Sequence, residues 1–199
     1  MLGRTATLSV MLLLLGTALG HAHKISATRK VIVTVKPASS GVSAEALVWM
    51  RLGGQRGARF VSQFDLDKDG QLNSIEARQL ADTLGPEAVG GLYLAWDGET
   101  IKPVAAESKA RLVAPRGVEV AILLSYAPRP MGAGRLRVAT HSGRDRIGTH
   151  PHVGEVGAIP PLKVHVGGAS MARIRPRKLT PKRPIDVLIR PLTPPGKVD

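Results

Sequence analysis

Residues 65–76 read DLDKDGQLNSIE, and this run limits the fold more than any other part of the chain. Asp65, Asp67 and Asp69 stand at alternate positions, followed by Gly70, where a sharp turn is easiest without a Cβ. Three carboxylates this close repel one another unless a cation lies among them. The run therefore predicts a metal-binding turn, and the alternative is an acidic turn that only caps a helix.

Both flanks of the run have helical spacing. Phe60, Val61 and Phe64 precede it on one face of an expected helix. After the run, apolar residues recur three and four positions apart, and Gly85-Pro86 is expected to end this second helix. The recurring apolar residues are Ala77, Leu80, Ala81 and Leu84.

With these flanks, residues 55–85 resemble the EF-hand family, which implies a helix–loop–helix that binds calcium through oxygen atoms. Mg²⁺ and Mn²⁺ use similar ligands, but a bidentate glutamate and a flexible oxygen cage favour Ca²⁺. The sequence has no second loop of this kind, so the hand is expected to pack against its own domain or another copy. The resemblance implies carboxylate oxygens from Asp65, Asp67 and Asp69, the main-chain oxygen of Gln71, a water held by Asn73 and both oxygens of Glu76.

Apolar residues alternate with other residues, as in strands, before and after the expected helix–loop–helix, beginning with Val31, Val33 and Val35. Gly and Pro separate many of the later segments by roughly 8–12 residues, which is typical of β-sandwiches. We therefore expect a mainly β fold, a small immunoglobulin-like sandwich of about seven strands with an inserted helix–loop–helix. Strands are expected at 28–36, 44–52, 100–105, 110–114, 118–126, 135–141, 162–166 and 185–189, and a short helix at 87–95.

The first 20 residues resemble a secretory signal peptide. Arg4 precedes an apolar stretch from Leu8 to Leu15, and residues 18–20 form a small-x-small cleavage site. The stretch is short for a membrane span, although an uncleaved anchor is the alternative. We expect an exported protein, periplasmic or extracellular, whose residues 21–199 form one β-rich domain. Because the chain has no cysteine, its stability has to come from packing and from the metal.

The order of segments is also similar to the extracytoplasmic N-terminal portion of hydrogenase/urease-accessory-type membrane proteins. Ala22-His23-Lys24 and the acidic loop at 65–76 carry this resemblance. The sequence has no multi-helix membrane part like that of those proteins, so the resemblance implies no transport function.

Charge is distributed unevenly along the chain, whose formal net charge is +13. Residues 65–100 hold eight acids and two bases, whereas residues 171–184 hold six bases, no acid and three prolines. We expect the 171–184 segment to be solvated and extended. The alternative is an adaptor surface for anionic lipid or polysaccharide. Nucleic acid is a poorer match, because no aromatic residue stands between these bases to stack on a nucleobase.

Histidines give a second possible metal site. Cleavage after Gly20 leaves His21 and His23 at the amino terminus, where the free amine and an imidazole suit copper. His150 and His152 form another close pair. The alternative is that these histidines are ordinary polar surface residues.

No catalytic constellation stands out in the sequence. It has no Gly-x-Ser-x-Gly, no cysteine nucleophile, no His-Glu-x-x-His and no phosphate-binding loop. The leading expectation is an exported, non-enzymatic protein that binds calcium structurally through one EF-hand. The two alternatives are a periplasmic copper-binding protein that uses its N-terminal histidine and a basic adaptor for an anionic surface.

Overall fold

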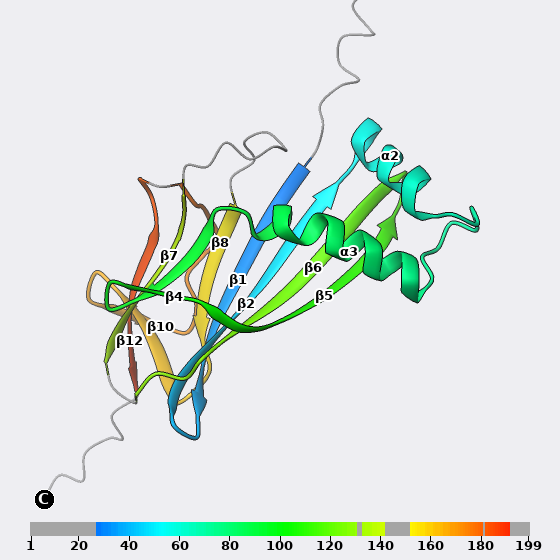
Figure 1. The fold of residues 1–199 in the computed structure, drawn as a ribbon. Helices are drawn as coiled ribbons and strands as arrows, with labels where there is room; N and C mark the ends of the chain where they lie inside the picture. Colours follow the sequence, from blue (N-terminus) through cyan, green and yellow to red (C-terminus); the bar gives the residue numbers. More distant parts are fainter. Residues whose placement is uncertain (1–26, 131–132, 142–151, 181, 192–199) are drawn as a thin grey trace, which may run out of the picture.

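The computed structural model describes residues 27–130, 133–141, 152–180 and 182–191, which form two β-sheets and two helices (Figure 1). The expected mainly β sandwich with an inserted pair of helices is confirmed. The described residues form twelve strands, six in each sheet, whereas about seven were expected. Within the described residues, no helix is both long enough and apolar enough to cross a membrane.

The first sheet, sheet A, is built around a long β-hairpin formed by residues 27–52. Its central strands pair antiparallel, whereas β1 (Ala27–Ala38) and β8 (His152–Ala158) run parallel. In spatial order the strands are β11 (Arg177–Lys178), β8 (His152–Ala158), β1 (Ala27–Ala38), β2 (Gly41–Leu52), β6 (Gly117–Tyr126) and β5 (Pro103–Val113).

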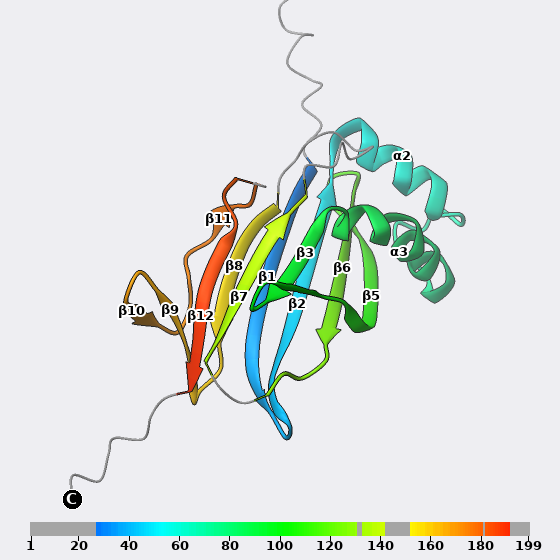
Figure 2. The same cartoon turned by 60° about the vertical axis from the view of Figure 1, so that its left-hand side comes forward.

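The second sheet, sheet B, packs over one part of sheet A and is antiparallel throughout (Figure 2). Its order is β10 (Ala169–Met171), β9 (Leu162–Val166), β12 (Ile185–Pro191), β7 (Gly134–Thr140), β3 (Leu92–Trp96) and β4 (Glu99–Ile101).

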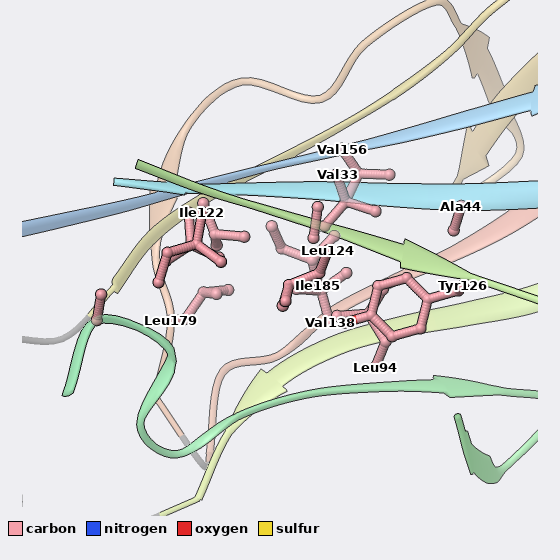
Figure 3. Packing of buried hydrophobic residues seen from close by; sticks show 14 of the residues in the cluster. Val33, Ala44, Leu94, Ile122, Leu124, Tyr126, Val138, Val156, Leu179 and Ile185 are labelled. Carbon is pink, nitrogen blue, oxygen red and sulfur yellow. The ribbon is translucent and has the colours of Figure 1, made fainter. Parts of the chain in front are cut away.

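The core lies between the inner faces of the two sheets. Alternate residues of β1 and β6 point inward and are buried, because side chains of a strand alternate between its two faces. Figure 3 shows Val33 and Leu124 of sheet A close to Val138 and Ile185 of sheet B. Few aromatic side chains contribute, so the core consists mainly of Val, Leu, Ile and Ala.

Helices α2 (Gly54–Phe64) and α3 (Ser74–Val89) cover the part of sheet A's inner face that extends beyond sheet B (Figures 1 and 2). Helix α3 contacts β5, β6 and β2, and α2 contacts β6. A Cβ added to Gly85 of α3 would lie 3.5 Å from Ile122 Cδ1, so helix and strand touch. The helical hairpin therefore packs on its own domain, one of the two arrangements that the sequence left open.

Two sequence-based expectations around this hairpin were wrong. Helix α3 continues through Gly85-Pro86 to Val89, because Leu84 and Ala88, one turn apart, both face the sheet and their burial outweighs the local stop signal. Residues 87–95 are not a helix: they contain the end of α3 and most of β3.

Other strands also differ from their expected bounds. The chain crosses from sheet B to sheet A between β4 and β5, so 100–105 is not one strand and β5 continues through 110–113. Strand β8 was not expected, because Gly154 and Gly157 weaken its apolar pattern. Gly154 is needed there, since an added Cβ would lie 2.7 Å from Leu179 Cδ1.

The basic segment at 171–184 is only partly the solvated stretch expected. Its described bases are exposed, but Ile174 and Leu179 are buried. The main chain of Leu179 donates a hydrogen bond to His152, and β11 pairs with β8. These contacts attach the segment to the edge of sheet A.

Candidate metal centre

Helices α2 and α3 hold the acidic loop between two packed ends. The rings of Phe60 and Phe64 stack with their centroids 6.1 Å apart, and Phe64 is buried where the loop begins. Helix α2 also lies directly on the sheet, because a Cβ added to Gly57 would be 2.6 Å from the Leu52 carbonyl oxygen and 2.8 Å from that of Arg116. The loop is therefore attached to the sandwich at its start.

The loop itself is folded by its own side chains. Main-chain N–H groups two to five residues further on donate to the three aspartates: Asp69 to Asp67 (3.3 Å), Gly70 to Asp65 (3.2 Å) and Gln71 to Asp69 (2.7 Å). Gly70 has a φ of +79°, a conformation that a residue with a Cβ rarely adopts. The turn expected at Gly70 is present.

The structure brings Asp65, Asp67 and Asp69 together. One carboxylate oxygen from each lies within 4.8 Å of the others. The ion pairs of the two helices lie elsewhere and join Arg56 to Glu87 and Arg78 to Asp82. None of the described Lys or Arg residues forms a salt bridge with the three loop aspartates, although Lys68 and Arg116 line the same hollow as Asp65.

Asp65 is the decisive member of the group. The residue is only 7% exposed, and its Oδ2 accepts a hydrogen bond from the N–H of Gly70. Oδ1 is fully buried and has no hydrogen-bond partner. A buried carboxylate oxygen without a partner destabilises the fold, because no hydrogen bond offsets the loss of its hydration. A cation at the aspartate group offsets that cost.

The other expected ligands, Gln71, Asn73 and Glu76, differ from the three aspartates in their contacts. Glu76 is buried, and its Oε1 and Oε2 accept hydrogen bonds from the N–H groups of Leu66 (2.9 Å) and Asn73 (3.0 Å). The Asn73 side chain accepts from Ile75 and Glu76, which completes a capping box at the start of α3. Gln71 is exposed. Glu76 is thus next to the loop main chain and outside the group of three aspartates.

These hydrogen bonds leave Glu76 able to act as a ligand. Each carboxylate oxygen has two lone pairs, and one bond to each oxygen leaves one pair free. The capping box also explains why Asn73 and Glu76 are spaced by three residues, a spacing that serves the helix whether or not a cation is bound. The two functions use the same residues and do not exclude each other.

Sequence reasoning missed one buried polar contact at the far end of α3. His152 of β8 is 1% exposed, and its Nε2 lies 2.9 Å from the carbonyl oxygen of Ala88. His152 is therefore not a surface histidine, and no local sequence signal connects residues 64 positions apart. His21, His23 and His150 lie outside the described residues, as do the expected signal peptide and its cleavage site.

Comparison with protein-family models gave no match, and comparison with curated protein sequences gave none either. The interpretation of the loop therefore depends on its own residues and geometry. Its donor set is made of hard oxygen atoms, which suit Ca²⁺, Mg²⁺ or Mn²⁺ and not the softer metals.

Proposed function

We propose that this protein binds one calcium ion in the loop at 65–76, and that the ion stabilises the helical hairpin on sheet A. The observation that carries the proposal is the buried, unpartnered Oδ1 of Asp65 beside the carboxylates of Asp67 and Asp69. A calcium ion takes six to eight oxygen ligands, so it can bind this oxygen, those of its neighbours and the free lone pairs of Glu76.

The packing of the hairpin supports a structural function over a sensor function. Sensor hands open to expose an apolar groove between their helices. Here Phe64, Leu80 and Leu84 belong to the same buried cluster as the sandwich core. Opening the hand would remove these side chains from the core, at a cost that a single weakly bound ion does not repay. Calcium therefore acts on the free energy of unfolding of this hairpin.

The proposed function suits an exported, non-enzymatic protein. Calcium modules outside the cytoplasm bind at about 10⁻⁴–10⁻³ M, where the ion is abundant. At ten times its Kd, an ion that binds only the folded state stabilises that state by about 1.4 kcal/mol. That is a measurable part of the stability of an ordinary domain, about 5–15 kcal/mol.

Calorimetric titration of calcium into metal-stripped protein tests the proposal. We expect one site, weakened at least tenfold in Asp65→Asn, which removes a charge and keeps the side-chain shape. The matched control is Asp82→Asn, which removes an exposed acid of α3 outside the loop. Magnesium titrated in the same way is expected to bind more weakly. Equal affinities in the two variants would refute the proposal, and so would a titration with neither heat nor a shift in melting temperature.

A further inference from the structure

We propose that the outer face of sheet B binds a sugar that carries a carboxylate, of the uronic acid type. This face has a hollow of about 660 Å³, within the range of pockets for small molecules. The hollow is separate from the calcium loop and from the basic segment at 171–184. Its lining comes from β3, β4, β7, β12 and their connections, and it includes Tyr93, Asp97, Arg135, Arg137, His141 and Asp186.

Strand register creates the hollow. On β7, Arg135 and Arg137 both point outward, because residues two apart share a face of the sheet. Arg137 stands between Ala95 of β3 and Asp186 of β12, and Arg135 stands beside Leu188. Ala95 is small and almost buried, so it forms the bottom of the hollow. The larger side chains around it form the walls.

The two arginines of this face differ in their partners. Arg137 makes a two-pronged contact with Asp186, with Nε–Oδ1 at 2.6 Å and Nη2–Oδ2 at 3.2 Å. The hydrogen bond and charge of Asp186 raise the pKa of Arg137 above its usual range. The guanidinium of Arg135 has no partner among the described side chains. An open guanidinium fork matches the two oxygens of a carboxylate.

An aromatic pair forms another side of the hollow. The rings of Tyr93 and His141 stack with their centroids 4.2 Å apart and their planes 20° from parallel. Both residues line the hollow, so the pair offers a flat face beside the arginines. Flat rings of this kind pack against other flat, partly apolar surfaces, and the C–H face of a sugar is one.

Asp97 indicates which anion fits. Its Oδ1 accepts a hydrogen bond from the Arg135 main chain at 2.7 Å, which leaves Oδ2 available. Together with Asp186 it balances the two arginines of the hollow, so a multiply charged phosphate or sulfate is disfavoured there. A ligand with one carboxylate and several hydroxyl groups satisfies Arg135, Asp97 and Thr100 at once.

Calorimetry with galacturonic acid, its neutral methyl ester and inorganic phosphate tests the ligand class, with calcium held at one concentration. We expect millimolar or tighter binding of the acid, at least tenfold weaker binding of the ester and weaker binding of phosphate. An ester that binds as well as the acid would overturn the proposal. So would phosphate binding more tightly than the acid, or no detectable binding of the acid.

Variants of the full protein locate the site. Arg135→Gln is expected to weaken binding of galacturonic acid about tenfold or more, as loss of a charged two-pronged contact does. Tyr93→Leu is expected to weaken it two- to tenfold. The matched control is Arg190→Gln, which removes an exposed arginine of the same sheet face that does not line the hollow. Equal losses in Arg135→Gln and Arg190→Gln would show general charge attraction and would overturn the proposed site.

Discussion

The acidic loop at 65–76 and the hollow on sheet B are both charged, but they are assembled in opposite ways. The loop takes its carboxylates from twelve consecutive residues, and hydrogen bonds between near neighbours orient them. The hollow takes its charged and aromatic side chains from three strands and the residues that directly follow two of them, spread between Tyr93 and Asp186, and the sheet register orients them. A locally built site can be recognised in a sequence, whereas a site built by register needs the structure.

The two sites also differ in burial. Oδ1 of Asp65 is buried without a partner, whereas Arg137 and Asp186 leave 49% and 39% of their side chains exposed. Water screens the exposed pair, so its net contribution is small. Asp67 and Asp69 are also exposed, but the buried carboxylate of Asp65 interacts through less water, so a bound cation has a larger effect on it. The following predictions test this contrast, from the largest expected effect to the smallest.

Truncation at the contact between hairpin and sandwich has the largest expected effect. Leu84 is 1% exposed, and Leu84→Ala removes buried methyl groups and leaves a cavity, at a cost of about 2–5 kcal/mol in the free energy of unfolding. Urea denaturation measures this cost. The matched control is Ile75→Ala on the same helix, where the side chain is 68% exposed and the expected cost is below about 0.5 kcal/mol. Similar costs in both variants would mean that the hairpin does not depend on sheet A.

Alkaline pH is expected to weaken the sandwich through Tyr126. Burial raises the pKa of this side chain from 10.0 to about 12. Between these values the folded state keeps the phenol proton and the unfolded state releases it, so stability falls as pH rises from about 10 to 12. The loss is about 1.4 kcal/mol per pKa unit. Urea melts across this range are expected to show a smaller loss in Tyr126→Phe, and identical profiles would contradict the assignment.

Neutralising one loop carboxylate is expected to change stability in opposite directions with and without calcium. Asp67→Asn reduces repulsion within the group of three aspartates, so calcium-free protein is expected to gain up to about 1 kcal/mol. In saturating calcium the same variant is expected to lose about 1 kcal/mol or more, because one charged ligand is gone. Thermal melts in chelator and in millimolar calcium measure both signs. A loss of equal size in both conditions would indicate a purely structural aspartate.

The smallest effect is expected on sheet B. Arg137→Gln removes the two-pronged contact with Asp186, yet the expected change in the free energy of unfolding is below about 1 kcal/mol, since the pair is exposed. Urea denaturation at low and high salt measures it, and the difference is expected to shrink as salt rises. A larger, salt-independent loss would show that this pair is more shielded from water than its exposure indicates.

Much of the fold was predictable from alternation alone. The valines of β1 and the alternating apolar residues of β6 identify strands that are buried on one face, and the acidic run at 65–76 identifies the hairpin. Strand β8 was not predictable in this way. Two of its seven residues are glycines, and Leu179, far along the chain, fills the space above Gly154. Its parallel pairing with β1 likewise depends on distant segments.

The candidate site shows the same limit. The sequence predicted that Asp65, Asp67 and Asp69 are close together, because their spacing is local. It did not show which oxygen is buried without a partner, since the burial of Asp65 depends on how α2 and α3 pack on sheet A. It also did not show that Gly85-Pro86 continues a helix, because the contact of Leu84 and Ala88 with the sheet decides that.

The most direct test of the calcium assignment compares two exposed glycines by nuclear magnetic resonance. Gly70 in the loop and Gly98 in the β3–β4 turn both have positive φ, +79° and +88°. Calcium is expected to shift the Gly70 amide strongly, because its N–H donates to Asp65, and to leave the Gly98 amide in place. In Asp65→Asn the Gly70 shift is expected to need at least tenfold more calcium. An unmoved Gly70 amide in the parent protein at millimolar calcium would contradict the account.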